Sequence, residues 1–253
     1  MKQLMRKIFR TLQVRFPALL EMRWAAQRFV LTVLHRPFDP DFRVLRLLKF
    51  AANEVLIDVG ANRGQSIDAM RLYLPDREIV AFEPNPELRR RLERRFPDVR
   101  IYGSGLGDAP GNLELKIPIY NRWQFDGQAS FSFSTNNLNF LAGSIIGFDP
   151  SKLEFATYVC QVRRLDDFML APGFIKIDTE GFERNVIKGG LATIAAHHPA
   201  IMMENSDNPE LDATELRALG YEPFNLSGDG ALTAGFGGRN TIYLHPSRRR
   251  NVE

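Results

Sequence analysis

The chain has 253 residues, of which 44% are hydrophobic and 25% are charged, and its formal net charge is +3. This length and composition predict one substantial α/β core with an extension, so no second large domain is needed. The positive charge is local, because residues 1–50 hold eleven Lys and Arg against three Asp and Glu, whereas residues 51–253 hold 22 against 27. The body is mildly acidic, and this charge does not favour a nucleic-acid-binding function.

The pattern of residues 1–50 predicts a basic amphipathic helical extension. Apolar side chains recur at helical spacing before Pro17 with lysine and arginine between them, and a second helical stretch follows. Charged residues leave no apolar span that could cross a bilayer, and no signal-peptide core precedes a cleavage site. Two roles stay open for the extension: a helical cap on the body or on a second subunit of a homo-oligomer, and peripheral contact of residues 1–34 with an anionic membrane.

The single cysteine, Cys160, has no partner for an intramolecular disulfide, and its valine neighbours predict a strand. A buried structural thiol in a reducing compartment fits this pattern. We therefore expect a cytoplasmic protein, which is membrane-associated if the extension contacts lipid.

Beyond residue 50, predicted strands and helices alternate. The strands lie at 54–59, 78–83, 99–103, 173–178 and 200–204, and the helices lie at 65–74, 86–96, 181–189 and 210–219. This alternation predicts a doubly wound, mainly parallel sheet over residues 51–246. Ligands of such folds bind beyond the carboxyl ends of the strands, so the residues at these ends are the candidates for a functional site.

Residues 105–165 interrupt the alternation. A short strand is predicted at 112–117, and residues 118–150 are rich in Asn, Ser, Gly and aromatic residues without helical periodicity. A segment of this length without regular structure predicts a substrate loop or a lid. At the other end of the chain, residues 247–253 are expected to form a solvated basic tail.

The first candidate site residues lie in the turn Asp58-Val-Gly-Ala-Asn-Arg-Gly64. Gly60 lets the backbone pass close to a ligand, and Gly64 lets the next helix begin tight against the strand. The turn lacks the Gly-Lys-Ser/Thr ending of a phosphate-binding Walker loop and the middle glycine of a dinucleotide-binding fingerprint. The turn therefore predicts a nucleotide-like ligand, with NAD disfavoured.

Glu83 ends the second predicted strand about twenty residues after the glycine turn. An acidic side chain at this position can accept hydrogen bonds from both hydroxyls of a ribose, which NAD and S-adenosylmethionine share. The third strand runs into a glycine-rich turn at 103–108, which includes Gly105 and Leu106. Its backbone either borders a purine ring or forms a simple turn before a hairpin.

Three carboxylates within six residues follow the fourth strand: Asp178, Glu180 and Glu183. Like charges at a strand end repel one another unless a ligand, a cation or a donor such as Lys176 separates them. Capping of a helix N-terminus is an alternative role for the two glutamates. Glu204 ends the fifth strand at the same edge, so Asp178, Glu180 and Glu204 could together hold a divalent cation, although no histidine ligand lies nearby and we expect no metal.

Taken together these motifs resemble the FkbM-type family of S-adenosylmethionine-dependent methyltransferases. The resemblance covers about residues 51–246, and the matching stretches are Asp58-Val-Gly-Ala-Asn-x-Gly64-Gln65, Phe82-Glu83-Pro84-x-Pro86, Gly105-Leu-Gly-Asp108, Arg164-Leu-Asp-Asp167 and Ile175-Lys-Ile-Asp-x-Glu-Gly-x-Glu183. It implies a class I methyltransferase fold with an antiparallel last strand. It also implies that Asp58, Gly60, Asn62, Gly64, Glu83, Gly105, Leu106 and Asp178 border S-adenosylmethionine.

The implied reaction is O-methylation of a hydroxyl on a sugar, a glycan or a natural-product acceptor. Asp178 or Glu180 would accept the hydroxyl proton, and Trp123 and Phe131 would shape the acceptor pocket. Two other classes stay open: a nicotinamide-dependent oxidoreductase, which also needs Glu83, and a non-catalytic methyltransferase-like protein tethered to a membrane by its basic extension.

Overall fold

The computed structural model describes residues 7, 11, 23, 26–28, 30–31, 33–132 and 135–249. Most of the predicted amphipathic pattern before residue 33 and the last four residues of the predicted tail lie outside them. None of the helices in this described part of the chain has the length and hydropathy needed to cross a bilayer.

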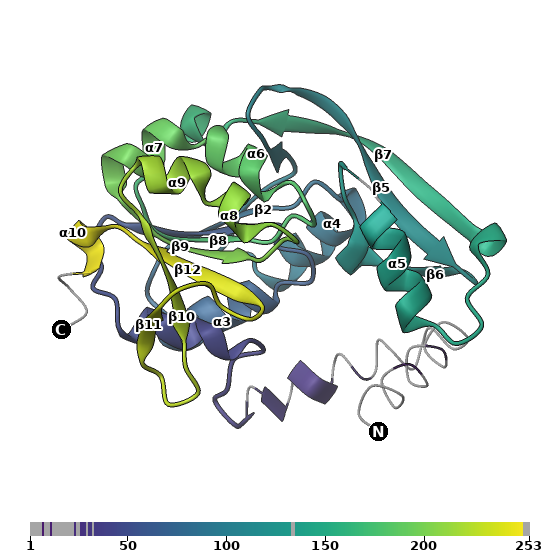
Figure 1. Cartoon of the computed structure of the whole chain (residues 1–253), viewed down its shortest axis with the longest axis horizontal. Helices are drawn as coiled ribbons and strands as arrows, with labels where there is room; N and C mark the ends of the chain where they lie inside the picture. The colour runs from purple at the N-terminus through teal and green to yellow at the C-terminus, as the bar shows by residue number, and fades with distance from the viewer. Residues whose placement is uncertain are drawn as a thin grey trace.

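An eight-stranded sheet forms the centre of the protein, in the order β11-β10-β12-β9-β8-β1-β2-β3 (Figure 1). Five neighbouring strands are parallel and match the five predicted strands: β9 (Ala200–Glu204), β8 (Pro172–Ile177), β1 (Val55–Val59), β2 (Ile79–Phe82) and β3 (Arg100–Tyr102). The antiparallel strands are β12 (Asn240–Leu244), which pairs with β9, and then β10 (Glu222–Leu226) and β11 (Leu232–Ala234). The doubly wound, mainly parallel sheet is therefore confirmed, and so is its antiparallel strand.

Helices cover both faces of this sheet, because the central strands are apolar on both sides. One face packs on η1 (Pro40–Arg46), α3 (Gln65–Tyr73) and α4 (Pro86–Arg95). The other face packs on α6 (Glu183–Lys188), α7 (Leu191–His197) and α9 (Thr214–Ala218), with α8 (Pro209–Asp212) before α9. The helix predicted at 210–219 is thus two short helices, joined at Ala213.

The body of the domain begins earlier than the predicted boundary at residue 50. Phe42, Val44 and Leu45 of η1 are at most 2% exposed and join the core cluster formed by α3 and the sheet. Asp39 caps η1 by accepting a hydrogen bond from the backbone N–H of Asp41. Residues from about Asp39 onward therefore belong to the folded domain and not to an extension.

An insertion between β3 and β8 forms a second sheet in the order β4-β7-β5-β6. Its strands are β4 (Gly105–Leu106), β5 (Gly111–Tyr120), β6 (Trp123–Gln124) and β7 (Leu153–Arg163), and β5 and β7 make the long hairpin that projects from the body in Figure 1. The other elements are η2 (Asp126–Gln128), α5 (Thr135–Ser144), η3 (Pro150–Lys152) and η4 (Leu165–Phe168). The strand predicted at 112–117 is confirmed and is longer, and Cys160 is a buried strand residue as expected.

The prediction that residues 118–150 lack helical structure is wrong. They include helix α5 (sequence TNNLNFLAGS), in which Leu138, Leu141 and Ala142 follow the i, i+3, i+4 spacing of one helical face, with Leu141 buried and Phe140 exposed. This apolar stripe spans little more than one turn and lies among asparagines, which weakens the helical signal.

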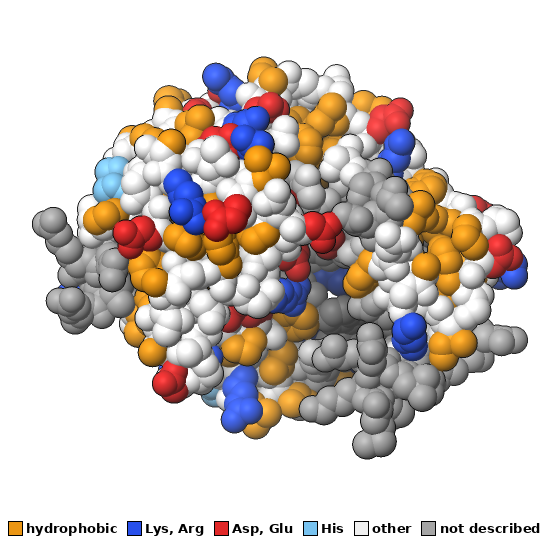
Figure 2. All heavy atoms as spheres, viewed as in Figure 1, with side chains coloured by type: hydrophobic (Ala, Val, Ile, Leu, Met, Phe, Trp, Pro, Cys, Tyr) orange, Lys and Arg blue, Asp and Glu red, His pale blue; other side chains and the backbone are white. Residues whose placement is uncertain are grey.

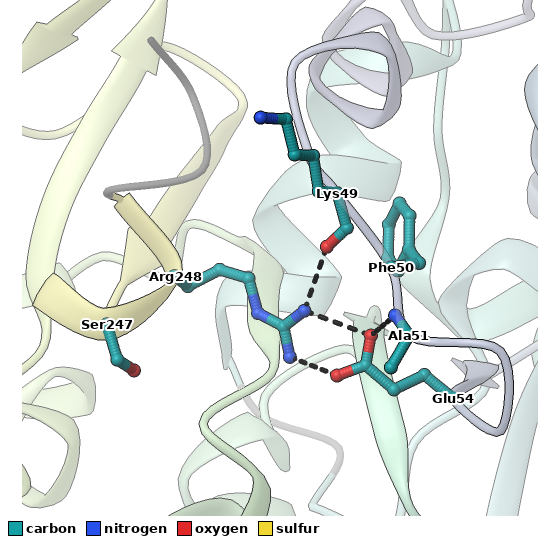
Figure 3. Close-up of a pocket in the computed structure, with 6 residues that line it drawn as sticks. All are labelled: Lys49, Phe50, Ala51, Glu54, Ser247 and Arg248. Carbon is teal, nitrogen blue, oxygen red and sulfur yellow. Dashed lines mark hydrogen bonds and ion pairs between the residues drawn. The ribbon is translucent and has the colours of Figure 1, made fainter.

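The predicted solvated tail is wrong for Arg248, in helix α10 (Pro246–Arg249). This side chain is 7% exposed and forms an ion pair with Glu54, with Nη2 2.6 Å from Oε1 (Figure 3). Its guanidinium also donates to the backbone carbonyls of Lys49, His197 and His198, which satisfies the buried charge. A pocket of about 370 Å³ borders this pair, and it lies at the amino end of β1, opposite the carboxyl ends that hold the candidate site residues.

Candidate active site

The turn between β1 and α3 passes directly against the end of β8. A Cβ atom built on Gly60 would lie 1.9 Å from the backbone carbonyl oxygen of Asp178, and Gly60 has a φ of 80°. Gly64, with a φ of 82°, lies against the ring of Phe96, so that α3 begins close to α4. Only glycine combines the left-handed backbone with this closeness. The tight helix start predicted for Gly64 agrees with this geometry, whereas the predicted passage of Gly60 close to a ligand stays a prediction.

Asp58 is completely buried, and neither of its carboxylate oxygens makes a hydrogen bond of normal geometry among the described residues. Burial raises its pKa to about 7, and Lys176 on the neighbouring strand lowers the pKa less than burial raises it. A buried carboxylate without donors costs stability. Asp58 is therefore ready to accept hydrogen bonds from a ligand that reaches the turn.

Glu83 ties the end of β2 to the glycine turn. It is 5% exposed, and its two carboxylate oxygens accept hydrogen bonds from the backbone N–H of Asn62 at 2.7 Å and of Asn85 at 2.9 Å. Burial raises its pKa to about 7, although these hydrogen bonds lower it. Each carboxylate oxygen keeps a further lone pair, so Glu83 can still accept hydrogen bonds from a ribose.

Three side chains at the ends of β8 and β9 form what we call the carboxyl cluster: Asp178, Glu180 and Glu204. One carboxylate oxygen of each lies within 4.8 Å of the others, and all three residues are partly exposed. Glu180 has a φ of 53° and is followed by Gly181 at 97°, so the chain turns sharply after β8 and brings Glu180 back over the strand ends. The structure thus brings together the three carboxylates that the sequence indicated for this edge.

The members of the carboxyl cluster differ in acidity. Burial and the neighbouring charge of Asp178 raise the pKa of Glu180 to about 9, and burial and the hydrogen bond with Asp178 raise that of Glu204 to about 8. The pKa of Asp178 is lowered, because Lys176, Glu204 and Arg239 together outweigh its burial. Asp178 and Glu204 thus share a hydrogen bond in which ionisation of one carboxyl opposes ionisation of the other, and Lys176 and Arg239 favour the charged form of the pair.

Two cations flank the carboxyl cluster. Lys176 is 2% exposed, and its ammonium donates to the Ile177 carbonyl at 3.0 Å and lies 3.5 Å from Asp178 Oδ2. Arg239 lies at the outer rim, with Nε 3.2 Å from Glu204 Oε1. Lys176 is thus the donor that the sequence indicated, whereas Arg239 was missed because it stands in a loop before β12 with no motif around it.

Glu183 makes hydrogen bonds with backbone N–H groups. It is 4% exposed, and its carboxylate accepts hydrogen bonds from the N–H groups of Thr179 at 2.8 Å and of Gly181 at 3.0 Å. These bonds hold the turn that carries Glu180. Glu183 therefore holds the turn before α6, and in the described part of the chain it makes no capping hydrogen bond to the N–H groups of that helix.

The N-terminal segment supports the same rim from the other side. Asn240 is 3% exposed and donates to Asp39 Oδ2 and to Asp41 Oδ2, both at 2.8 Å. Asn240 also pairs with Glu204 across the β12–β9 ladder, and Arg239 lies 3.9 Å from Asp39. Asp39 and Asp41 were missed as site residues because nothing in their local sequence indicates contacts about 200 residues away.

Residues 124–132 of the insertion, which we call the strap, bridge the glycine turn and the turn after β8. Asp126 forms an ion pair with Arg63 at 2.7 Å, and its backbone carbonyl accepts a hydrogen bond from the Asn62 side chain. At the other end, the Gln128 amide donates to Glu180 Oε2 at 3.1 Å, and the Ser130 hydroxyl donates to the Glu180 carbonyl at 2.8 Å. Figure 2 shows a hollow between the body and the insertion, with acidic and basic side chains on its walls.

The remaining predicted residues lie around this frame. Phe131, in the strap, packs edge to face on Phe182 with ring centroids 5.5 Å apart, and it also covers Gly105. Leu106 is 2% exposed and packs in the core, so that only its backbone is available to a cofactor. Trp123 packs in a small apolar cluster inside the insertion. The assignment of these four residues to cofactor or acceptor stays a prediction.

The sheet order, the antiparallel β12, the glycine turn after β1 and the acidic residue after β2 together define the class I methyltransferase fold. Residues 58–223, about two thirds of the chain, match the family described as Methyltransferase FkbM domain. The chain therefore belongs to the FkbM methyltransferase family, and the nicotinamide-dependent alternative is disfavoured.

Two similar proteins illustrate the family. The chain is 29% identical over 161 residues to the AMB antimetabolite synthetase AmbE of Pseudomonas aeruginosa, a match that covers 53% of this chain and 8% of AmbE. It is 19% identical to methyltransferase FkbM from Methylobacillus flagellatus, whose crystal structure superposes with a TM-score of 0.50 over 81% of this chain and 48% of that one. The chain thus spans less than a tenth of AmbE and about half of the FkbM structure.

Proposed function

We propose that this methyltransferase uses S-adenosylmethionine to methylate a hydroxyl group on a sugar, a glycan or a natural-product acceptor. The observation that carries this proposal is the position of the carboxyl cluster, whose charged member Asp178 lies directly behind the glycine turn. The name of AmbE, an antimetabolite synthetase, supports a natural-product acceptor.

The residues around the glycine turn fit S-adenosylmethionine. Among the described residues, the buried carboxylate of Asp58 makes no hydrogen bond of normal geometry, and the ammonium group of the methionine part would donate to it. Glu83 would accept hydrogen bonds from the ribose hydroxyls, and its hydrogen bond from the backbone N–H of Asn62 holds it beside the glycine turn. S-adenosylmethionine supplies an electrophilic methyl group on a sulfonium sulfur.

Asp178 would accept the proton of the acceptor hydroxyl as its oxygen bonds to the methyl group. Its lowered pKa keeps it ionised at neutral pH, whereas Glu180, with a pKa of about 9, is protonated and better suited to donate a hydrogen bond to the acceptor. Of the two predicted bases, the charges therefore favour Asp178. The strap would cover the acceptor, because Gln128 contacts Glu180 directly.

No metal is required for this mechanism. Lys176 and Arg239 already place two positive charges beside the carboxyl cluster, and these charges lower the pKa of Asp178. A divalent cation bound by Asp178, Glu180 and Glu204 remains the alternative that their spacing allows.

Calorimetric titration with S-adenosylhomocysteine tests the cofactor, with NADH as the competing ligand. We expect the wild type to bind S-adenosylhomocysteine and Glu83→Gln to bind it at least tenfold more weakly, because hydrogen bonds to a charged acceptor contribute about 1.5–3 kcal/mol each. Glu78→Gln is the matched control, since Glu78 is half-exposed and precedes the same strand. A folded protein that binds NADH, or that binds neither ligand, contradicts the proposal.

The catalytic role is tested by methyl transfer to a panel of hydroxylated acceptors. We expect Asp178→Asn to bind S-adenosylhomocysteine and yet to lose roughly 10²- to 10⁴-fold in kcat, the usual contribution of a general base. Full turnover of Asp178→Asn would show that another group accepts the proton of the acceptor hydroxyl. Cofactor binding without transfer to any acceptor would favour the non-catalytic alternative.

A further inference from the structure

The described residues between Arg23 and Phe38, which we call the arm, have two different sides. Gln27, Arg28 and Leu31 are partly buried and line a pocket of about 310 Å³ together with residues of α3, including Ala69 and Leu72. This side of the arm therefore faces the body of the domain.

Beside this side, the arm carries an exposed apolar stripe of Val30, Val33 and Leu34. These side chains are 50%, 58% and 54% exposed, and they follow the i, i+3, i+4 spacing of one helical face. The backbone N–H of Leu34 donates to the carbonyl of Val30 at 2.9 Å, which places the three residues on consecutive helical turns. Three large apolar side chains on one outward face indicate a binding surface more than scattered exposed residues do.

Two exposed arginines flank the stripe in the sequence. Arg23 and Arg36 are exposed, and residues 22–38 contain three arginines and no Asp or Glu. A second copy of the chain is a poor partner for this surface, because a twofold interface would place the arginines of one copy against those of the other. An apolar stripe flanked by arginines is instead suited to the interface of an anionic bilayer.

We infer that the stripe of Val30, Val33 and Leu34 inserts into the surface of a membrane with anionic lipids, while Arg23 and Arg36 contact the headgroups. Among the described residues, the arm would then be the part that contacts the membrane. No methyl acceptor is needed to test this, so its failure would leave the methyl-transfer proposal standing.

The experiment is flotation of the full-length protein with vesicles of phosphatidylcholine alone or with about one third phosphatidylglycerol. We expect the protein to bind the anionic vesicles at least tenfold more strongly than vesicles of phosphatidylcholine alone. This binding should weaken as the salt concentration is raised, because salt screens the attraction between the arginines and the headgroups. The double variant Val33→Asp with Leu34→Asp should lose at least tenfold of this binding, since it removes apolar contact and adds repelled charge.

Val159→Asp is the matched control, because Val159 is 73% exposed on β7 of the insertion. Unchanged binding of this control and an unchanged melting temperature of the double variant support the inference. Equal binding to both vesicle types, or wild-type binding by the double variant, would overturn it. A shift from dimer to monomer in the double variant, with vesicle binding retained, would overturn it in favour of a second copy of the chain.

Discussion

Replacing Gly60 by alanine tests the contact between the glycine turn and Asp178. The added methyl group would lie 1.9 Å from the carbonyl oxygen of Asp178 and 3.0 Å from its carbonyl carbon, whereas ordinary contacts are 3.4–4 Å. The turn or the end of β8 must therefore move by more than 1 Å. Gly230 offers a control, because its φ of 94° is also left-handed but no atom lies within 4 Å of a Cβ built there.

The two substitutions separate backbone strain from the steric clash. The left-handed backbone alone costs about 1 kcal/mol for alanine, so Gly230→Ala should lower the Tm by roughly 2–4 °C. Gly60→Ala adds an overpacking cost of about 1–3 kcal/mol, and its Tm should fall by roughly 5–15 °C. Thermal denaturation followed by circular dichroism measures both, and S-adenosylhomocysteine binding should weaken only in Gly60→Ala. Equal Tm shifts for the two variants would refute the proposed contact.

Three further predictions concern the charged groups. Arg248→Ala should destabilise the domain by about 3–5 kcal/mol in urea denaturation at pH 7, because it leaves Glu54 charged and without its partner. The pKa of Glu54 is lowered in the folded protein, so the difference in stability between the variant and the wild type should shrink as the pH falls below 4.5. Arg239→Gln should shift the acidic limb of the kcat profile to higher pH, since Arg239 lowers the pKa of Asp178, and an unchanged profile would contradict this role. Treatment with a chelator should change kcat less than about twofold, because Lys176 and Arg239 supply the positive charge. Loss of activity that a divalent cation restores would show that the enzyme needs a metal ion.

The sequence was most informative where local patterns determine structure. Runs such as Leu56-Ile57 and Phe174-Ile175 are apolar because both faces of their strands are buried, and these apolar runs identified the parallel strands. Glu83 and Asp178 could be found because each follows such a strand directly. Their position at the carboxyl edge is a property of the fold class and needs no knowledge of distant contacts.

Contacts between distant segments could not be predicted in this way. Arg239 reaches the carboxyl cluster only because β12 runs antiparallel beside β9, and the strap reaches Glu180 only because β5 and β7 pair over their whole length. The buried position of Arg248 depends on Glu54, nearly 200 residues earlier. Helix α5 was missed for a different reason, since its apolar stripe is short and several asparagines surround it.

The hydrogen bonds of Asn240 to Asp39 and Asp41 affect the order in which the site can form during synthesis. A chain leaving the ribosome would complete β1, β2 and β8 well before β12 exists, since domains form from the N-terminal side during synthesis. The ends of β1 and β2, with Asp58 and Glu83, can thus be in place while the outer rim near Glu204 is still missing. The carboxyl cluster gains Arg239 only when β12 can pair with β9, so a chain truncated before Arg239 would keep Lys176 beside Asp178 but would lack one of the charges that lower the pKa of Asp178.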